Sequence, residues 1–520
     1  MEHDRMNNDG DDIADAKFVP HTLLGFTFNL NREADKDLLV MHSFDDLIPH
    51  FDLEVGPTPF LKVGKGADTI NVPLNAYVAS RMRIDGANEM DDPTYYEAFA
   101  VKRKRVAEAL ICQTYAKGFE TPSAVQAVAT MELVLGRDCL VQSKSGTGKT
   151  HTFLMGTAWH FDPDDKRLQH IFITATHEVA TQIYDQVVEL LPTDTSIALC
   201  IGRKNDEQKF AEGFRPPVRT SNIVAKGRPQ LTSVQERIQV QKAQIIVGTM
   251  GKIYDFLYNK QWANMDSLKS FCVDEFDTIV TSRSRAANGM NTEEQIADII
   301  KVIPVDTQRA FFSATINARA LKISYNYFRR YNPDIGEPFL ALLDIDDYTL
   351  EGIKQYYVEC SSNEEKQDVL LDLISQCRIA QGIIFANKIG TADDLKALLD
   401  RQEIPISSAV FHSNLSAQRR QEIHQSLKDN KVRLLISTDI TSRGLDLQSV
   451  NVVFNFDMPD SLDTYIHRVG RSGRYGRKGV AISLVLVNQH KDEMRKVKGI
   501  NECSKSSPME QLPENLGCLL

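Results

Sequence analysis

The sequence predicts an α/β protein built from two parallel β-sheets, each flanked by helices. Short apolar runs rich in β-branched residues recur from about residue 115 onward, with helix-like segments between them. These runs are continuously apolar rather than alternating, which is typical of strands buried on both faces of a parallel sheet. A polar, acid-bearing stretch over 341–352 separates two complete sets of such runs. Because connections between domains commonly have this composition, we expect a domain boundary near residue 347.

The expected elements follow the apolar runs in chain order. The strands are expected over 138–143, 170–176, 243–249, 270–276 and 309–315 in the first domain, and over 381–387, 432–438, 450–456 and 480–486 in the second. The segments between them are long enough for the crossover helices that parallel strands require. The expected parts of the chain are an acidic, partly ordered extension over 1–94, a first domain over 95–346, a second domain over 347–490 and a tail over 491–520.

The cysteine content and the distribution of apolar residues indicate where in the cell the protein is expected. The chain has eight cysteines and no Cys-x-x-Cys pair, so neither a zinc ribbon nor a disulfide framework is expected. It opens without a signal segment and contains no apolar stretch of about eighteen residues, which predicts neither secretion nor a membrane span. We therefore expect an intracellular protein, in the cytoplasm or the nucleus.

The negative charge is concentrated at the start of the chain. The net charge is -10, and residues 1–60 hold thirteen acidic and four basic side chains. The acidic average therefore does not exclude a local basic surface that binds nucleic acid. The sequence leaves three interpretations of the acidic extension open: an autoinhibitory mimic of nucleic acid, a tail that binds a protein partner, or a solvated segment.

A glycine-rich stretch, SKSGTGKT over 143–150, lies between an expected strand and an expected helix. Such a turn directs backbone N–H groups inward, and the helix N-terminus adds positive potential, so the stretch is suited to hold the phosphates of a nucleotide. Lys149 and Thr150 are then the phosphate lysine and the Mg²⁺ hydroxyl. Ser143 stands where this pattern usually has its first glycine.

A pair of acids, Asp274 and Glu275, follows the apolar run that begins at 270. One carboxylate at such a strand end can bind Mg²⁺, and the next can orient the attacking water of phosphoryl transfer. Taken alone, the same residues also suit a solvated acidic turn. The phosphate-binding stretch favours the catalytic interpretation.

Arginines recur near the end of the second domain in HRVGRSGR over 467–474. Arg468, Arg471 and Arg474 are three residues apart, so on a continuous helix they would share one face. Guanidinium groups bound to phosphate oxygens stabilise the charge of a transition state. Taken alone, the arginines could form a basic cluster on the surface or a patch that binds polyanions. Because the first domain has a phosphate-binding stretch, we favour an arginine-finger role.

Together the motifs resemble those of the DEAD-box ATP-dependent RNA helicases of helicase superfamily 2, over about 95–490. GFETPSAVQ over 118–126 is similar to the Q motif of that family, and SAT over 313–315 is similar to its motif III. GIIFANK over 382–388 and STDITSRGLD over 437–446 are similar to motifs IV and V. The resemblance implies two tandem RecA-like domains, with ATP and Mg²⁺ as cofactors and RNA as the partner.

The resemblance also implies roles for individual residues. The residues expected to bind ATP are Phe119, Gln126, Ser143, Lys144, Ser145, Gly146, Thr147, Gly148, Lys149, Thr150 and Asp446. The expected catalytic residues are Lys149, Asp274, Glu275, Arg471 and Arg474, with Thr150 and Asp274 on Mg²⁺. The residues expected to couple ATP to RNA are Asp277, Ser313, Thr315 and His467, and the two hydroxyls are expected to bond to Asp277. The expected RNA contacts are Thr176, Thr249, Gly251, Thr438 and Arg443.

Several first-domain residues differ from the family pattern. His177 stands where an arginine is usual, Met250 and Lys252 stand for the proline and arginine of another turn, and Arg203 stands for a glycine. These positions are the ones that the resemblance assigns to the RNA backbone. Phe276 replaces an alanine beside the acids, which predicts slower coupling.

The connection between Arg203 and Arg237 is longer than a compact turn needs and holds eight basic against four acidic residues. It is either an additional basic contact to RNA or a solvated loop.

The leading hypothesis is an RNA-stimulated ATPase that separates short RNA duplexes or remodels RNA–protein complexes. A second hypothesis is an ATP-gated RNA clamp or scaffold with little unwinding. A DNA helicase is the third. Measurements of ATP turnover with RNA and with DNA, beside duplex separation, distinguish the three.

Overall fold

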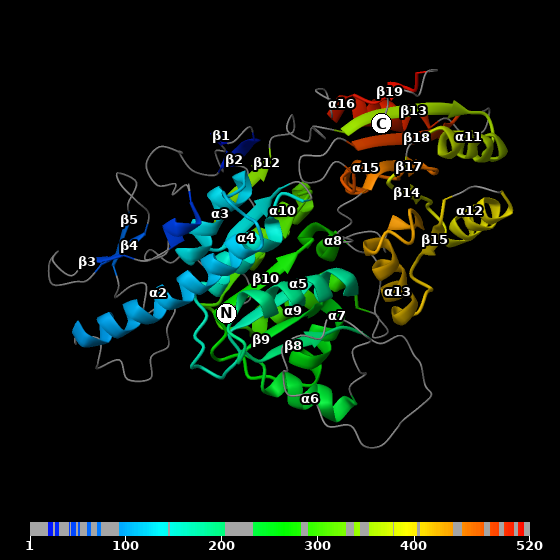
Figure 1. Cartoon of the computed structure of the whole chain (residues 1–520). Helices are drawn as coiled ribbons and strands as arrows, with labels where there is room; N and C mark the ends of the chain where they lie inside the picture. The colour runs from blue at the N-terminus through cyan, green and yellow to red at the C-terminus, as the bar shows by residue number, and fades with distance from the viewer. Residues whose placement is uncertain are drawn as a thin grey trace, which may run out of the picture. The chain divides into compact units, whose positions relative to one another are not determined.

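The structure is a computed structural model of the 520-residue chain (Figure 1). It describes residues 19–23, 26–30, 41, 43–47, 50–52, 60–63, 70–73, 93–143, 146–202, 232–281, 290–328, 337–343, 353–377, 379–402, 406–439, 450–472, 479–487, 493–503 and 508–513. The chain forms two compact units, and the change from the first to the second falls between Leu343 and Asp344. The predicted boundary at 347 lies outside the described residues, and the predicted domain bounds stay predictions.

The first unit is organised around a nine-stranded sheet with the order β1-β2-β12-β6-β11-β10-β7-β9-β8. The strands from β12 to β8 run parallel, whereas β1 and β2 form an antiparallel hairpin that pairs with β12. The strands are β1 (Val19–Leu23), β2 (Phe26–Leu30), β6 (Cys139–Gln142), β7 (His170–Thr174), β8 (Ile197–Cys200), β9 (Ile245–Thr249), β10 (Ser270–Asp274), β11 (Gln308–Ser313) and β12 (Phe339–Leu343).

Helices cover both faces of this sheet, which explains why its strands are continuously apolar. In β6, Cys139 and Val141 pack into one core, whereas Leu140 packs into the other. The first core receives α2 (Pro93–Ala116), α3 (Ala124–Val134), α4 (Lys149–Ala158) and α5 (His177–Leu190). The second core receives α6 (Ser233–Gln241), α7 (Met250–Tyr254), the π-helical turn η4 (Asp255–Asn259), α8 (Phe276–Thr281), α9 (Thr292–Val302) and α10 (Ala318–Tyr327).

Part of the expected N-terminal extension packs onto the first unit. The 3₁₀ turn η1 (Phe44–Leu47) is anchored at two places: Met41 N–H donates to Ala127 O at 2.9 Å, and Trp159 Nε1–H donates to Leu47 O at 3.0 Å. A separate antiparallel sheet is formed by β3 (His50–Asp52), β4 (Phe60–Val63) and β5 (Ile70–Pro73). The 1–60 segment therefore contributes folded structure as well as negative charge.

Buried glutamines close the amino edge of the first sheet. The side-chain amides of Gln169 and Gln244 both donate to Asp165 O at 2.7 Å, and that of Gln308 donates to Arg137 O at 2.7 Å. These bonds tie the loops that enter β7, β9 and β11 to their neighbours. The carboxyl edge is thereby the one available for a binding site, as is usual in open parallel sheets.

The second unit contains a seven-stranded parallel sheet with the order β15-β16-β14-β17-β18-β13-β19. Its strands are β13 (Ile353–Cys360), β14 (Gln381–Phe385), β15 (Ser408–Phe411), β16 (Leu434–Ser437), β17 (Val450–Asn455), β18 (Gly479–Leu486) and β19 (Glu510–Gln511). Its helices are α11 (Asn363–Gln376), α12 (Ile389–Arg401), α13 (Ala417–Lys428), α15 (Leu462–Val469) and α16 (Met494–Cys503).

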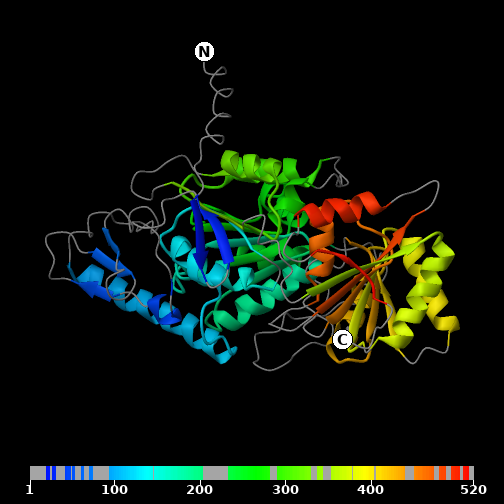
Figure 2. The ribbon, with the colours of Figure 1, turned by 90° about the horizontal axis from the view of Figure 1, so that it is seen from above.

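Helices also lie on both faces of the second sheet (Figure 2). The α11 and α12 helices contribute to one core, and α13, α15 and α16 contribute to the others. The predicted fold class, two α/β units each with a helix-flanked parallel sheet, is confirmed. Within the described ranges, every helix is either too short or too polar to cross a bilayer.

Candidate functional site

The phosphate-binding stretch forms a turn between β6 and α4. Ser143 N–H donates to Ser313 O at 3.0 Å, and Lys149 Nζ donates to Ser143 O at 2.5 Å. Gly148, which caps α4, has φ of 99°, a left-handed conformation that a residue with a Cβ rarely adopts. The ammonium group of Lys149 is therefore held against the backbone of the turn. Lys144 and Ser145 lie outside the described residues.

Ser143 is accommodated by hydrogen bonds inside this turn. The Ser143 and Thr147 hydroxyl oxygens are 2.6 Å apart, and Ser123 Oγ donates to Thr147 O at 2.6 Å. The buried serine thus ties the first part of the turn to the last, and Ser123 connects the turn to α3. These bonds explain how serine can replace the usual glycine.

Gln126 lies directly against the phosphate-binding turn. Its Oε1 accepts from the backbone N–H of Ser123 at 2.8 Å, in the capping box that starts α3. A Cβ added to Gly148 would lie 2.6 Å from Gln126 Nε2. Glycine is therefore required at 148 for a second reason, which is the close approach of the Gln126 amide.

Phe119 lies in an aromatic cluster that the motifs did not predict. Its ring stacks on His151, with centroids 4.8 Å apart and planes at 18°, and Phe44 meets His151 edge-on at 6.2 Å. His151 Nε2 lies 2.9 Å from Thr114 Oγ1. Burial, and then the charge of Lys117, lower the pKa of His151 to about 4, so the imidazole is neutral near pH 7. No spacing rule pairs residue 44 with residue 151, so sequence reasoning missed this cluster.

Asp274 ends β10 and Glu275 follows it, and β10 is separated from β6 by β11 alone. Asp274 is 7% exposed, and burial raises its pKa while the charge of Lys149 opposes that rise. Glu275 N–H donates to Asp274 Oδ1 at 2.9 Å, and Glu275 has φ of 54°. A left-handed backbone at a residue other than glycine is strained and is common at functional sites. The phosphate lysine and the acids therefore share one end of the sheet.

The hydrogen bonds expected at Asp277 are present. Ser313 Oγ donates to Asp277 Oδ1, and Thr315 Oγ1 donates to Asp277 Oδ2 at 2.5 Å. All three side chains are buried. Because Ser313 O also accepts from Ser143 N–H, this acid is linked through Ser313 to the phosphate-binding turn.

Phe276, which replaces the family's alanine, starts α8 and points into the second core. Its side chain is fully buried and stacks on Phe311 with centroids 4.4 Å apart and planes at 15°. It also meets Tyr327 edge-on at 6.5 Å. The larger side chain is thus matched by aromatic neighbours on β11 and α10.

The first three expected RNA contacts gather at the carboxyl ends of β7 and β9. Thr174 of β7 pairs with Thr249, the last residue of β9. Thr176 caps α5, with its hydroxyl accepting from Val179 N–H at 3.4 Å, and Thr249 caps α7. Gly251 lies in the first turn of α7. We call Thr176, Thr249 and Gly251 the edge cluster.

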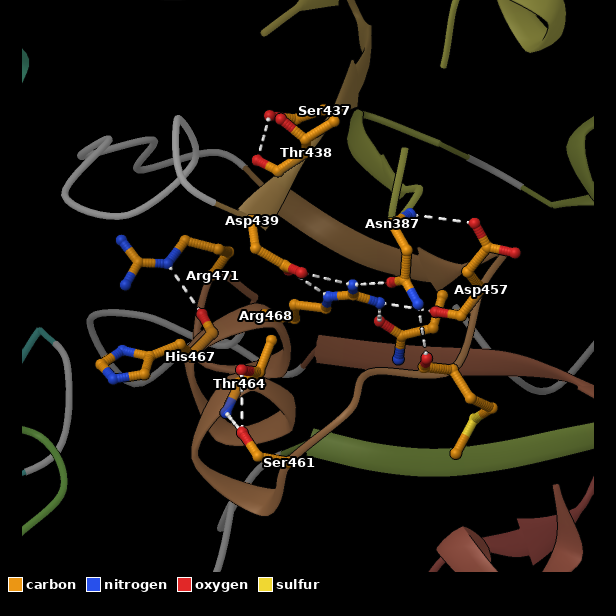
Figure 3. Close-up of polar contacts among 12 residues, drawn as sticks. Asn387, Ser437, Thr438, Asp439, Asp457, Ser461, Thr464, His467, Arg468 and Arg471 are labelled. Carbon is orange, nitrogen blue, oxygen red and sulfur yellow. Dashed lines mark hydrogen bonds and ion pairs between the residues drawn. The ribbon is translucent and has the colours of Figure 1, made fainter. Parts of the chain in front are cut away.

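In the second unit, Arg468 is the centre of a buried polar network (Figure 3). It is 1% exposed, and its Nε and Nη2 donate to the two carboxylate oxygens of Asp439 at 2.5 and 2.7 Å. Nη2 also donates to Asn387 Oδ1, and Nη1 donates to Asp457 O, each at 2.6 Å. These partners follow β16, β14 and β17, so Arg468 ties three strand ends to α15.

Arg471 lies beyond the end of α15, and the expectation that it shares a helical face with Arg468 is wrong. Its Nε donates to His467 O at 3.0 Å, and its side chain points away from the Arg468 network (Figure 3). The reason is that α15 ends at Val469, so the helical spacing does not continue to residue 471. His467 and Thr438 are both buried. Arg443, Asp446 and Arg474 lie outside the described residues.

Comparisons with known proteins match both units. The family described as DEAD/DEAH box helicase matches residues 123–323, and the helicase conserved C-terminal domain matches residues 365–476. Protein R458 of Acanthamoeba polyphaga mimivirus, whose name assigns it provisionally to the ATP-dependent RNA helicases, is 52% identical over 99% of this chain and 100% of its own length. The ATP-dependent RNA helicase eIF4A of Mycosarcoma maydis is 32% identical over 84% of this chain and 94% of its own length.

A solved structure has a similar fold. Dbp5 of S. cerevisiae bound to RNA and ADP BeF3 superposes with a TM-score of 0.63 at 27% identity, over 78% of this chain and 93% of the Dbp5 chain.

Proposed function

Since the chain belongs to the DEAD-box family of ATP-dependent RNA helicases, we propose that it hydrolyses ATP to separate short RNA duplexes or to remodel RNA–protein complexes. The identity of 52% to R458 over nearly the full length of both chains supports this proposal. The likeness to Dbp5 in a complex with RNA and a nucleotide supports RNA as the partner.

The observation that carries the proposal is the approach of Lys149 and Asp274 at one end of the first sheet. They come from α4 and β10, and the charge of Lys149 lowers the pKa of Asp274 against the effect of burial. A lysine that can neutralise phosphate oxygens thus lies at the same end of the sheet as a carboxylate suited to phosphoryl transfer.

The residues at this end suit Mg²⁺. Mg²⁺ prefers oxygen ligands and is commonly held by one or two carboxylates together with the phosphates of the substrate. Asp274 is a buried carboxylate whose charged form a cation would stabilise, and Thr150 offers a hydroxyl at the start of α4. We propose that Asp274 and Thr150 hold Mg²⁺, which would neutralise charge on the phosphates.

The remaining residues of the ATP site have separate proposed roles. Gln126 reads the adenine edge, because its amide supplies a donor and an acceptor, and Phe119 packs beside the base. Glu275 orients the attacking water. Arg471 and Arg474 stabilise the charge of the transition state, and Asp446 binds the ribose. Ser143, Lys144, Ser145, Gly146, Thr147 and Gly148 surround the phosphates.

RNA is proposed to lie along the edge cluster of the first unit and along Thr438 and Arg443 of the second. Threonine hydroxyls and backbone N–H groups at strand ends can bind phosphates and 2′-hydroxyls without reading the base sequence. Asp277, Ser313, Thr315 and His467 are proposed to couple the state of the nucleotide to RNA binding. The hydroxyl bonds to Asp277 support this coupling.

The cellular location and the protein partner of the chain are also proposals. We propose a location in the cytoplasm or the nucleus. We also propose a protein partner for the acidic segment 1–60, whose charge favours a basic surface.

The test compares the wild-type protein with Glu275→Gln. The wild type should turn over ATP faster when single-stranded RNA is added and should separate a short RNA duplex only with ATP. Glu275→Gln should lose turnover, because the water is no longer oriented, yet keep RNA bound in the presence of ATP. Full turnover by Glu275→Gln would show that the water-orienting carboxylate is elsewhere.

The alternative function is an ATP-gated RNA clamp with little unwinding. It is favoured by Phe276, whose ring is buried against Phe311 of β11 directly after the acids. RNA-stimulated turnover without separation of the duplex, in the same assay, would select this alternative.

A further inference from the structure

Lys252, the residue after the edge cluster, forms an ion pair within the first unit. Its Nζ lies 3.4 Å from Glu236 Oε2. The two side chains are 17% and 16% exposed. Glu236 lies in the first half of α6 and Lys252 lies in α7. A cation beside the expected RNA path is therefore already matched by a carboxylate of the same unit.

A second contact fixes the ammonium group from another side. Lys252 Nζ lies 4.5 Å from the centroid of the Phe256 ring, a favourable position for a cation over an aromatic face. Phe256 is buried in the second core, so the ring cannot follow a moving lysine. The lysine is thus held by a carboxylate from α6 and by a ring of the π-helical turn η4.

Both charges of the pair also influence the pKa of a neighbouring thiol, that of Cys200. Cys200 lies at the end of β8 and pairs with Gly248 of β9. Burial raises the pKa of Cys200 to about 12, while Lys252 lowers it and Glu236 raises it. Both charges therefore lie close enough to the end of β8 to shift the pKa of this thiol, and they shift it in opposite directions.

Another basic position at this edge is His177. It starts α5 next to Thr176, and a Cβ added to Gly202 would lie 3.5 Å from its Nε2. An imidazole, unlike a guanidinium group, is not permanently charged. The positions that the family pattern fills with arginine thus offer a histidine and a lysine paired with a glutamate.

We propose that Glu236 competes with the RNA backbone for Lys252 and so limits both the affinity for RNA and its dependence on salt. The inference rests on the proposed contact between the edge cluster and RNA. A phosphate that reaches Lys252 must displace the carboxylate, so one anion replaces another and few counterions are released. Removing the Glu236 charge converts this exchange into a simple attraction between a cation and a phosphate.

The experiment measures the binding of the full-length protein to a labelled oligouridine, with a non-hydrolysable ATP analogue, by fluorescence anisotropy over a series of salt concentrations. Glu236→Gln should tighten binding about two- to fivefold at low salt, the range expected for a partly exposed pair. It should steepen the plot of log Kd against log salt by about 0.7, which corresponds to one added phosphate contact on a single strand.

A control variant removes an ion-paired acid from the opposite edge. Asp194 pairs with Lys166 at 3.5 Å, in the loops that lead into β8 and β7. Asp194→Asn makes the same change in net charge, yet it should leave both the affinity and the salt slope as in the wild type. An equal tightening by Asp194→Asn would mean that net charge alone is responsible, and would overturn the proposal.

Lys252→Met provides the second measurement, in case Glu236→Gln disturbs the packing of α6. Because the removed cation was already compensated, the salt slope of Lys252→Met should equal that of the wild type, and adding Glu236→Gln to it should not steepen the slope. A slope shallower by about 0.7 in Lys252→Met would overturn the proposal. So would unchanged RNA affinity in a Glu236→Gln protein with the melting temperature of the wild type.

The RNA-stimulated ATPase activity of the wild type distinguishes a failure of the proposed function from a failure of the proposed competition. If RNA does not stimulate the wild type, the proposed function fails. If stimulation is normal and the Glu236 results fail, only the competition is wrong.

Discussion

At the scale of single residues, Asp274 shows how a site can work against the stability of its own fold. Burial raises the pKa of this carboxyl, and neither Lys149 nor the Glu275 N–H compensates fully. The folded protein therefore holds this proton more tightly than the unfolded chain does. It follows that ionised Asp274 destabilises the fold at pH values above its folded-state pKa, and that this penalty disappears as the pH falls.

Asp274→Asn should consequently raise the melting temperature of the nucleotide-free protein at neutral pH, although we expect it to abolish ATP turnover. The difference from the wild type should shrink toward acidic pH, because the wild-type carboxyl becomes protonated there. Differential scanning fluorimetry at a series of pH values measures both trends. A melting temperature at or below that of the wild type at neutral pH would contradict the prediction.

Some residues of the site were predictable from the sequence because contiguous motifs specify them. Asp277, Ser313 and Thr315 form the bonds that the resemblance predicted. Their two motifs lie at the carboxyl ends of adjacent parallel strands, β10 and β11. Arg468 could not be interpreted in this way. Its partners come from the ends of β14, β16 and β17, and local spacing carries no information about them.

At the scale of elements, strongly apolar runs were the predictable part. The predicted strands over 138–143, 170–176 and 450–456 contain β6, β7 and β17 almost residue for residue. The strand predicted to end at residue 276 ends at Asp274, because Glu275 adopts a left-handed backbone and α8 begins at Phe276.

Several strands were not predicted, each for a physical reason. The β13 strand contains exposed polar residues between buried ones, so it lacks the continuous apolarity of its neighbours. The β1–β2 hairpin pairs with β12, more than three hundred residues later in the chain, which no local pattern reveals.

The η1 turn offers a test of how much the N-terminal segment supports the ATP site. Phe44 is 1% exposed and contacts Tyr115 and His151. Phe44→Ala should reduce the stability of the first unit by about 3–5 kcal/mol, through lost burial and a cavity. It should also weaken ATP binding, because the ring that Phe119 stacks on loses its support.

Thermal melting and the binding of a fluorescent ATP analogue measure these effects. Val305, which is 75% exposed, supplies the matched control, since Val305→Ala should change neither quantity. If Phe44→Ala melts and binds like Val305→Ala, η1 does not support the site.

At the scale of the whole molecule, each unit has its own sheet and its own cores. Fragments 1–343 and 344–520 should therefore each fold when expressed alone, with the cooperative melting expected of a packed domain. The first fragment should bind ATP, because it contains Lys149, Asp274 and Gln126. Neither fragment should hydrolyse ATP in response to RNA, because the arginines proposed to stabilise the transition state, Arg471 and Arg474, belong to the second.

Turnover assays and circular dichroism on the two fragments test this division. RNA-stimulated turnover by the first fragment alone would remove the catalytic role proposed for the arginines. Loss of helical structure in either fragment would contradict the independence of the units.

The placement of β12 has a mechanical consequence. The chain leaves the first unit from this strand, which is held on one side by β6 and on the other by β2. Tension along the strand loads the hydrogen bonds of both ladders together, so they resist as a group rather than opening one after another. Residues from the start of the chain, in β2, thus reinforce β12 against pulling, and β12 is the strand that leads to the second unit.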